Sequence, residues 1–282
     1  MQVEDQASKL RQLMGQVAGA RTIAVASGKG GVGKSNVALN LAVLLSAAGS
    51  RVALVDADFG LANLDVLAGV DVTANLSHVI AGTRRLEDVV VDLSCGVQLV
   101  PGASGLARMA HLTEFQRAQL ARELTALEAD NGIVIVDCGA GIGPDVMHFA
   151  AAAENVLVVT APEPTAITDA YALIKLLHRR GFEGHVSVVV NFSPDRHIAR
   201  ATYERISTVA RQFLGVRVFD GGHIVDDPKV RQAVCRREPF VLAYPKCPAR
   251  RCLEALAIKL CSGDGLLMQK EGFFRRVVNW FG

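Results

Sequence analysis

The sequence has few aromatic residues, few cysteines, no long apolar run and almost no net charge. Aromatic residues make up 5% of the 282 residues, and the six cysteines are scattered through the chain. Scattered thiols in a chain of this length fit a reduced cytoplasmic protein better than a disulfide framework. No run of about 18 apolar residues is present, which argues against a membrane-spanning helix. The net charge of +2 gives no reason to expect a general nucleic-acid binder.

Half of the residues are hydrophobic, and they occur in short continuous runs separated by helical patterns. Continuous runs are typical of strands buried on both faces, and alternating strands and helices indicate right-handed parallel crossovers. We therefore predict an α/β fold with a mostly parallel twisted sheet flanked by helices. Strands are expected at Thr22–Ala26, Arg51–Asp56, Val97–Pro101, Ile133–Asp137, Val156–Thr160, Val186–Asn191 and Val216–Phe219, with helices that include Ser35–Ala48 and Thr113–Ala129.

A glycine-rich loop follows the first predicted strand and opens the first predicted helix of this fold. Residues 28–35 read GKGGVGKS, which satisfies the P-loop pattern G-x-x-x-x-G-K-[ST]. Its glycines let backbone N–H groups turn toward phosphates, Lys34 would neutralise phosphate oxygens, and the Ser35 hydroxyl would ligate Mg²⁺. The predicted nucleotide contacts in this region are Gly28, Lys29, Gly30, Gly31, Val32, Gly33, Lys34, Ser35 and Asn36.

Lys29 is a second lysine that an ordinary P-loop does not need. A lysine at the start of the loop can reach the phosphates of another subunit and supply positive charge in trans. The spacing K-G-G-x-G-K-[ST] is the deviant Walker A signature, and with it the sequence resembles the MinD/ParA group of dimerising P-loop ATPases. The resemblance implies an ATP-dependent homodimer in which Lys29, Lys34 and Asp58 take part in catalysis.

Three aspartates stand at the ends of predicted apolar strands. Asp56 and Asp58 close the second strand, and Asp137 closes the strand that begins at Ile133. A carboxylate at such a position is costly unless a cation or hydrogen bonds hold it. Asp137 is interpreted as the Walker B residue that holds Mg²⁺. By resemblance, Asp58 orients the attacking water and Asp56 supports the metal shell beside Ser35, the alternative for Asp56 being a cap of a helix or turn.

The identity of the nucleotide base is predicted from the lack of a guanine-binding motif and from the family resemblance. No N-K-x-D motif follows a later strand, so the aspartate that usually binds guanine is missing and ATP is favoured over GTP. The resemblance implies that Asn191 and Asp227 lie near adenine. Val225 stands where the family usually has proline two residues before that aspartate, which leaves the geometry of this loop open.

The last residues form an apolar stripe with a helical period and basic flanks, as expected for a helix that lies in a membrane surface. This ending resembles the membrane-targeting helix of MinD. A terminal helix docked on its own core is the alternative. The residues predicted to contact an anionic membrane are Phe273, Phe274, Arg275, Arg276, Val277, Val278, Trp280 and Phe281.

The first residues distinguish this chain from a MinD-type protein, which typically begins at the first strand. Residues 5–11 read DQASKLR and resemble the D-Q-A-x-x-L-R segment of the FlhG (FleN) family of flagellar number regulators, as does the stretch EPTAITDAY at 163–171. In that family the first segment engages the GTPase FlhF, whose active site the glutamine completes. Asp5, Gln6, Leu10 and Arg11 are therefore the predicted partner residues, with a solvated leader helix as the alternative.

Together these features predict a partner-binding helix in residues 1–20, an ATPase domain in residues 21–262 and a membrane-targeting helix in residues 263–282. The expected protein is a cytoplasmic ATP-driven switch that binds the inner face of the cell membrane reversibly and controls flagellar number and placement. Expected partners are FlhF, flagellar switch-complex proteins and a flagellar transcription activator.

Three alternatives come from the same fold. A MinD-type regulator of division-site placement would share every catalytic residue, and a ParA-type partner of DNA would use the basic cluster between Lys229 and Arg251. An iron–sulfur relative needs cysteines at the dimer seam, where only Cys138 is near.

Overall fold

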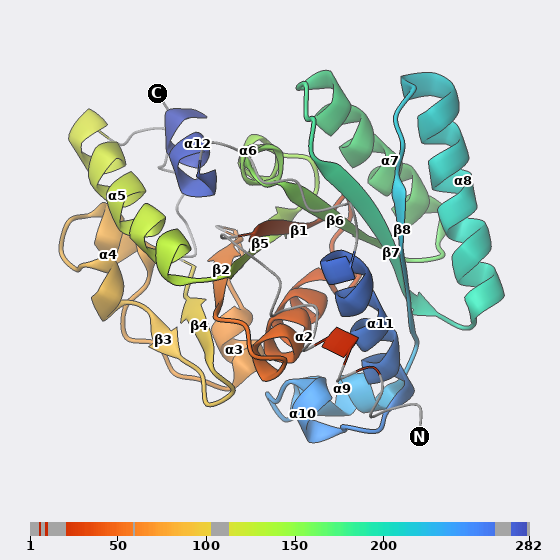
Figure 1. Ribbon diagram of the computed structural model, residues 1–282, viewed down its shortest axis with the longest axis horizontal. Helices are drawn as coiled ribbons and strands as arrows, with labels where there is room; N and C mark the ends of the chain where they lie inside the picture. Colours follow the sequence, from red (N-terminus) through yellow and green to blue (C-terminus); the bar gives the residue numbers. More distant parts are fainter. Residues whose placement is uncertain are drawn as a thin grey trace.

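The fold is described by a computed structural model (Figure 1) that covers residues 6, 9–10, 21–58, 60–102, 113–262 and 272–280, without the side chains of 114–118, 120, 262 and 278–280. Its centre is an eight-stranded sheet with the order β3-β4-β2-β5-β1-β6-β7-β8. Every neighbouring pair is parallel except β3 and β4. The strands are β1 (Arg21–Ser27), β2 (Val52–Ala57), β3 (Val91–Asp92), β4 (Val97–Val100), β5 (Ile133–Ala140), β6 (Asn155–Thr160), β7 (His185–Ser193) and β8 (Phe219–Val225).

Helices cover both faces of the sheet, as the alternating pattern predicts (Figure 1). One apolar cluster joins residues of α4, α5, α6, α7, α8 and α12 to one face, and a second joins residues of α2, α9, α10 and α11 to the other. The helices are α2 (Lys34–Ala47), α3 (Leu64–Ala68), α4 (Leu76–Ile80), α5 (Glu114–Asp130), α6 (Pro144–Ala152), α7 (Pro164–Arg179), α8 (Arg196–Leu214), α9 (Pro228–Cys235), α10 (Phe240–Ala243), α11 (Pro248–Ser262) and α12 (Phe273–Trp280), with a 3₁₀ turn at Leu86–Asp88.

The predicted fold class is confirmed, one strand prediction needs correction, and one strand was not predicted. The last strand was expected at Val216–Phe219 but begins at Phe219 and runs to Val225. Its sequence FDGGHIV contains an aspartate and two glycines, which have low strand propensity, so its pairing with β7 rather than its own composition makes it a strand. The short antiparallel β3 was not predicted because two residues carry no readable period.

The carboxyl ends of the parallel strands gather at one edge of the sheet. Ser27 of β1, Ala57 of β2, Ala140 of β5 and Ser193 of β7 end there, and α2 begins just after β1. Loops at this edge of a parallel sheet are where ligands bind in open α/β folds. No helix within the described residues has the length and apolarity needed to cross a bilayer.

Candidate nucleotide site

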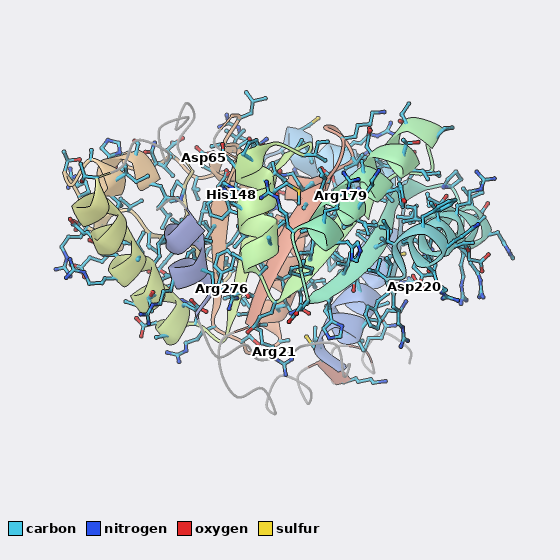
Figure 2. The ribbon with its side chains drawn as sticks, turned by 90° about the horizontal axis from the view of Figure 1, so that it is seen from above. Arg21, Asp65, His148, Arg179, Asp220 and Arg276 are labelled. Carbon is cyan, nitrogen blue, oxygen red and sulfur yellow. The ribbon has the colours of Figure 1, made fainter. Side chains whose placement is uncertain are left out.

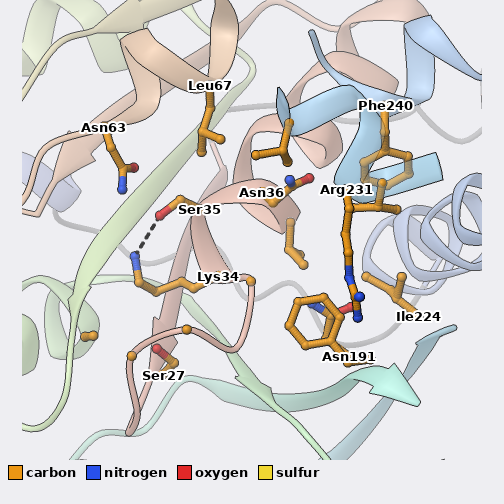
Figure 3. Close-up of a pocket in the computed structure, with 18 of the residues that line it drawn as sticks. Ser27, Lys34, Ser35, Asn36, Asn63, Leu67, Asn191, Ile224, Arg231 and Phe240 are labelled. Carbon is orange, nitrogen blue, oxygen red and sulfur yellow. Dashed lines mark hydrogen bonds between the residues drawn. The ribbon is translucent and has the colours of Figure 1, made fainter. Parts of the chain in front are cut away.

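The carboxyl edge of the sheet holds a cavity of about 700 Å³ between the glycine-rich loop and helices α9 and α10 (Figure 3). Most of the predicted loop residues line it, together with residues from β7, β8 and α9. The lining includes Ser27, Gly30, Gly31, Gly33, Lys34, Ser35, Asn36, Asp58, Asn191, Phe192, Ile224, Val230, Arg231, Val234 and Phe240. A nucleotide-sized pocket that joins polar groups on one side to apolar groups on the other suits a triphosphate with a base.

The loop conformation depends on glycine at two positions. A Cβ atom on Gly28 would clash with the backbone carbonyl group of Asp169, so no other residue fits there without displacement. Gly33 has a φ of 82° and ends the turn that starts α2 at Lys34. The N-terminus of α2 therefore faces the cavity, where its unpaired N–H groups and partial positive charge favour an anion.

Lys34 and Asp137 form a buried ion pair beside the loop. The Lys34 Nζ atom lies 2.6 Å from Asp137 Oδ1, with 6% and 1% of the two side chains exposed. The same Nζ atom lies 3.3 Å from the Ser35 hydroxyl, the contact dashed in Figure 3. Burial raises the pKa of Asp137, and the charge of Lys34 opposes that rise. This ion pair holds the lysine predicted to bind phosphate next to the predicted Walker B carboxylate.

The donor set around Asp137 fits a magnesium ion that shares its ligands with phosphate. Asp137 Oδ2 is buried and has no hydrogen-bond partner in the described part of the chain, and the Ser35 hydroxyl is adjacent. Mg²⁺ is usually held by one or two carboxylate or hydroxyl oxygens plus substrate phosphates. The described residues contain no group of three or more His, Cys, Asp or Glu that could hold a metal ion. Ser35 and Asp137 are the residues that would hold the ion.

The Asp56 carboxylate is held by backbone N–H groups. Its Oδ1 accepts the N–H of Asp58 at 3.0 Å, and its Oδ2 accepts those of Asn63 and Leu64 at 3.0 and 3.1 Å. Burial and the charge of Asp137 raise the pKa of Asp56 to about 6. Both carboxylate oxygens are thus occupied by the backbone that follows β2, and Asp56 does not line the cavity. These contacts are those expected of the capping alternative, and support of the metal shell by Asp56 stays a prediction.

Asp58 and Asn36 both line the cavity, as predicted for residues that face the nucleotide. Asp58 Oδ1 accepts the N–H groups of Gly60 and Leu61 at 3.1 and 3.0 Å. The same oxygen faces β5, where a Cβ atom on Gly139 would lie 3.6 Å from it. The geometry is compatible with a water-orienting role for Asp58, which stays a prediction.

Lys29 is not among the residues that line the cavity, and neither are Gly28 and Val32. The Lys29 Nζ atom binds Glu163 Oε2 at 2.7 Å and Thr165 Oγ1 at 3.0 Å. Its side chain is 38% exposed. Glu163 and Thr165 belong to the EPTAITDAY stretch, so this stretch anchors the second lysine at the molecular surface.

Of the two predicted adenine residues, the structure brings one to the cavity. Asn191 is buried, lines the cavity and donates from Nδ2 to the Val32 carbonyl at 2.8 Å. Asp227 does not line it: its Oδ1 accepts the N–H of Lys229 at 2.9 Å and its Oδ2 that of Ala249 at 3.2 Å. The Asp227 carboxylate therefore caps α9 and fixes the start of α11.

Sequence reasoning missed several residues that line the cavity near Asn191. Phe192 and Arg231 line it together with Ile224, Val234 and Phe240. The only available signal was position, since Phe192 directly follows the predicted base residue Asn191 and Arg231 lies in the loop-helix segment after Asp227.

Helix α12 is docked on the body of the protein, between α5 and α6 (Figure 2). Phe273 and Phe274 are completely buried, and Val277 is 1% exposed. The Glu128 carboxylate accepts the N–H of Phe273 at 3.0 Å and that of Phe274 at 3.4 Å. Arg276 Nε donates to the Ala152 carbonyl at 2.8 Å. In this structure the predicted membrane face is therefore turned inward, as the docked alternative describes.

Other predicted tail residues are only partly described. Arg275 is exposed, the side chains of Val278 and Trp280 are outside the described set, and so is all of Phe281. At the other end, Gln6 is half-buried and Leu10 is 3% exposed within the apolar cluster of α2 and α11. Asp5 and Arg11 lie outside the described residues. Leu10 packs in the apolar core here, and its role as a partner residue stays a prediction.

Comparisons with known proteins agree with this site. Residues 20–181 match the family described as AAA domain. The chain is 41% identical to the antiactivator FleN of Pseudomonas aeruginosa, with 88% of this chain and 89% of that protein covered. It is 33% identical to the flagellum site-determining protein YlxH of Helicobacter pylori, with 92% and 90% covered.

A solved structure gives the same fold. The septum site-determining protein MinD of Pyrococcus horikoshii, in complex with Mg-ADP, superposes with a TM-score of 0.71 at 25% identity, covering 88% of this chain and 100% of that one. Fold, loop and relatives point to the same chemistry, hydrolysis of ATP with Mg²⁺. The chain belongs to the FleN (FlhG) group of the MinD/ParA family of deviant Walker A ATPases.

Proposed function

We propose that this ATPase is a dimerising, membrane-associated switch that controls the number and placement of flagella. The observation that carries the proposal is the position of Lys29. Its ammonium group is held at the surface by Glu163 and Thr165 and does not line the cavity of its own chain. A lysine of the loop that lies outside its own phosphate site is available to the phosphates of a second copy.

The rim of the cavity supports a face that a second copy covers. Leu61 lines the cavity and is 76% exposed, and Ile142, which follows β5 at the same edge, is 47% exposed. Exposed large apolar side chains next to a functional site are typical of interaction surfaces. A dimer formed across this edge would shield both residues and bring each Lys29 to the opposite subunit.

Membrane binding by α12 requires the helix to leave its groove. Burial of Phe273, Phe274 and Val277 contributes roughly 5–9 kcal/mol at 1.5–3 kcal/mol for each side chain. Transfer of the same side chains to lipid recovers most of this term, because one apolar environment replaces another. Two terms then remain. Leaving the groove loses the hydrogen bonds made by Glu128 and Arg276, which favours the docked helix. Attraction to anionic lipid contributes roughly 1 kcal/mol per basic residue, which favours the membrane-bound helix.

These terms nearly cancel for one subunit, so the oligomeric state decides the outcome. Two α12 helices on one dimer bind the same membrane, and the second binds at a high effective concentration. ATP-dependent dimerisation would therefore shift the protein to the membrane without any new contact in α12. Hydrolysis with Asp58 would return the subunits to the docked form.

The flagellar role rests on the relatives and on the first residues. The relatives include an antiactivator, FleN, and a flagellum site-determining protein, YlxH. FlhF, switch-complex proteins and a flagellar transcription activator are the partners we propose. Because Leu10 is buried against the core, engagement of FlhF would require Leu10 to leave the core, with Gln6 then able to reach the GTPase site.

The DNA-binding alternative is less well supported by the basic cluster. Arg250 of this cluster pairs with Glu254, and only 23% and 6% of the two side chains are exposed. Charges already paired within the chain contribute less to a phosphate-binding surface. Salt-sensitive, ATP-dependent retention on DNA without liposome binding would favour this alternative.

The biochemical test is cosedimentation of the full chain with anionic liposomes in ATP and in ADP. We expect ATP to promote sedimentation and both Lys34→Ala and Lys29→Ala to abolish the effect, the first by loss of nucleotide binding and the second by loss of the dimer. Phe213→Ser, which changes an exposed phenylalanine on α8 far from α12, is the matched control and should behave like the wild type. Equal sedimentation in ATP and ADP, or a fully active Lys29→Ala, would refute the switch.

The cellular test is deletion of the gene in its source organism, with flagella and septa counted by microscopy. Altered flagellar number with normal septa is the expected result. Minicells with unchanged flagella would assign the protein to division-site placement, the MinD-type alternative.

A further inference from the structure

The end of β7 departs from a regular strand at the cavity. Successive side chains of a strand point to opposite faces, yet Asn191 and Phe192 both line the cavity. Phe192 has a φ of 53°, in the left-handed region that non-glycine residues rarely adopt, and the pairing of β7 with β8 shifts between Val190 and Ser193. The left-handed residue turns the chain so that two consecutive side chains reach the same site.

The surrounding residues hold Phe192 in this conformation. Asn191 Nδ2 donates to the carbonyl of Val32, which ties the strand end to the glycine-rich loop. The Phe192 ring packs on Gly33, where a Cβ atom would lie 3.0 Å from its Cζ. A residue strained in this way persists only where its neighbours hold it, and such residues cluster at active sites and ligand clamps.

The opposite wall of this part of the cavity combines apolar side chains with one cation. Val230, Val234 and Phe240 line it, and Arg231 extends from α9 toward Asn191 in Figure 3. Arg231 pairs with Asp226 at 3.2 Å, but the two side chains are 72% and 44% exposed. An ion pair this exposed contributes little, so the guanidinium can turn to a ligand.

We propose that Phe192 stacks on the nucleotide base and that Arg231 covers the other face of that base. An aromatic ring can stack on any base, and a guanidinium is attracted to a π face. The phosphates would then be held by the loop and the base by this pair, with Asn191 between them. The inference rests on nucleotide binding at the loop and is independent of dimerisation and membrane binding.

The test separates base contacts from phosphate contacts. Calorimetric titration of the full chain with Mg²⁺ uses two probes, ATP and inorganic tripolyphosphate, which has no base. Phe192→Leu should weaken ATP binding about tenfold, a value within the range for aromatic–base stacking. Its affinity for tripolyphosphate should not change.

Two further variants keep the test decisive if Phe192→Leu folds poorly. Phe192→Asn suits the left-handed backbone and removes the ring, so it should lose ATP affinity to the same extent. Arg231→Ala alters only an exposed side chain and should weaken ATP binding about 2- to 5-fold, again without an effect on tripolyphosphate. Equal losses for both probes would mean that Phe192 merely supports the loop, and an unchanged ATP affinity would mean that no base stacks there; either result overturns the proposal.

Discussion

The Nζ atom of Lys34 lies 2.6 Å from Oδ1 of Asp137, and the pair is shielded from solvent. The cation that a P-loop directs at phosphate is thus neutralised by the carboxylate that is predicted to hold the metal. When Lys34 turns to a phosphate, Asp137 loses its counter-charge in a buried position. A divalent cation at Asp137 is the group that would restore the balance, because an unpaired buried carboxylate is costly.

Removal of Mg²⁺ should therefore weaken ATP binding as well as hydrolysis. We expect a chelator to lower the ATP affinity of the wild type by about 10- to 100-fold, the cost of leaving a buried charge partly unpaired. In Asp137→Asn, which has no charge to balance, the chelator effect should be much smaller. Calorimetry with and without the chelator measures both, and an equal chelator effect in the two proteins would show that Asp137 does not sense the ion.

Replacement of Asp58 should separate binding from hydrolysis. Asp58→Ala removes the carboxylate that lines the cavity and should lower the rate of ATP hydrolysis by at least about 10²-fold, the usual share of a proton-accepting group. ATP should still bind, and the membrane-bound form should accumulate. Asp58→Asn keeps an oxygen that can accept the N–H groups of Gly60 and Leu61, so it separates loop support from catalysis. Normal hydrolysis by either variant would rule out the assignment of Asp58.

Two glycines of the loop should respond differently to the same substitution. Gly28→Ala places a Cβ atom against the backbone carbonyl group of Asp169, whereas Gly30→Ala meets only the Ala140 side chain at 3.8 Å. Backbone cannot give way as a flexible side chain does, so Gly28→Ala should cost about 1–3 kcal/mol of unfolding free energy. Gly30→Ala should leave it nearly unchanged. Denaturant unfolding without nucleotide is the measurement, and equal stabilities of the two variants would contradict the close approach of Asp169 to Gly28.

The sequence was sufficient for the fold because the buried strands are continuous apolar runs. β1, β2, β5 and β6 lie within a few residues of their predicted bounds. It was insufficient for β8, whose residues Asp220, Gly221 and Gly222 oppose strand formation and are held by pairing with β7. The phosphate side of the site was equally readable, because its residues are consecutive in the chain.

The other parts of the site depend on contacts that are distant in sequence. In the sequence, Asp56 and Asp137 look alike, because both stand at the end of an apolar strand. In the structure, the chain after β2 folds back so that the N–H groups of Asn63 and Leu64 donate to the Asp56 carboxylate, which identifies it as a cap. The apolar stripe of α12 has the sequence pattern expected both for a helix in a membrane surface and for a helix docked in a groove of the protein. Docking of α12 involves Glu128, which accepts the N–H of Phe273 and lies 145 residues before it in the chain.

Glu128 should control how firmly α12 is docked. Its carboxylate accepts the first two N–H groups of the helix, and an acceptor with negative charge at a helix N-terminus contributes about 0.5–2 kcal/mol. If α12 is the membrane helix, Glu128→Ala should raise liposome binding in the absence of ATP several-fold, and Glu128→Gln, which keeps an oxygen acceptor, should raise it less. Glu204→Ala, on the exposed face of α8, serves as the control. Unchanged binding of Glu128→Ala would mean that the docked helix is not what limits membrane association.

Stability should decrease as the pH rises through the pKa of Asp56. That pKa is about 6 in the folded protein, mainly because of burial, against 3.8 as the ordinary value. The folded state therefore binds the proton more tightly than the unfolded state. The resulting stabilisation is complete below about pH 4 and is lost as the pH rises through about 6, a change of about 3 kcal/mol.

Denaturant unfolding without nucleotide, from about pH 4 to about pH 7, measures this effect. Asp56→Asn removes the titrating group and should flatten the profile, with the remaining slope in the same direction due to Asp137, whose pKa is also raised by burial. Asp92→Asn, which changes an exposed carboxylate on β3, should keep the wild-type slope. If Asp56→Asn also kept that slope, the pH dependence would belong to another group and the cap would be ionised throughout the range. If it flattened the profile, the carboxylate that holds the start of α3 would be established as a proton-binding group that opposes folding near neutral pH.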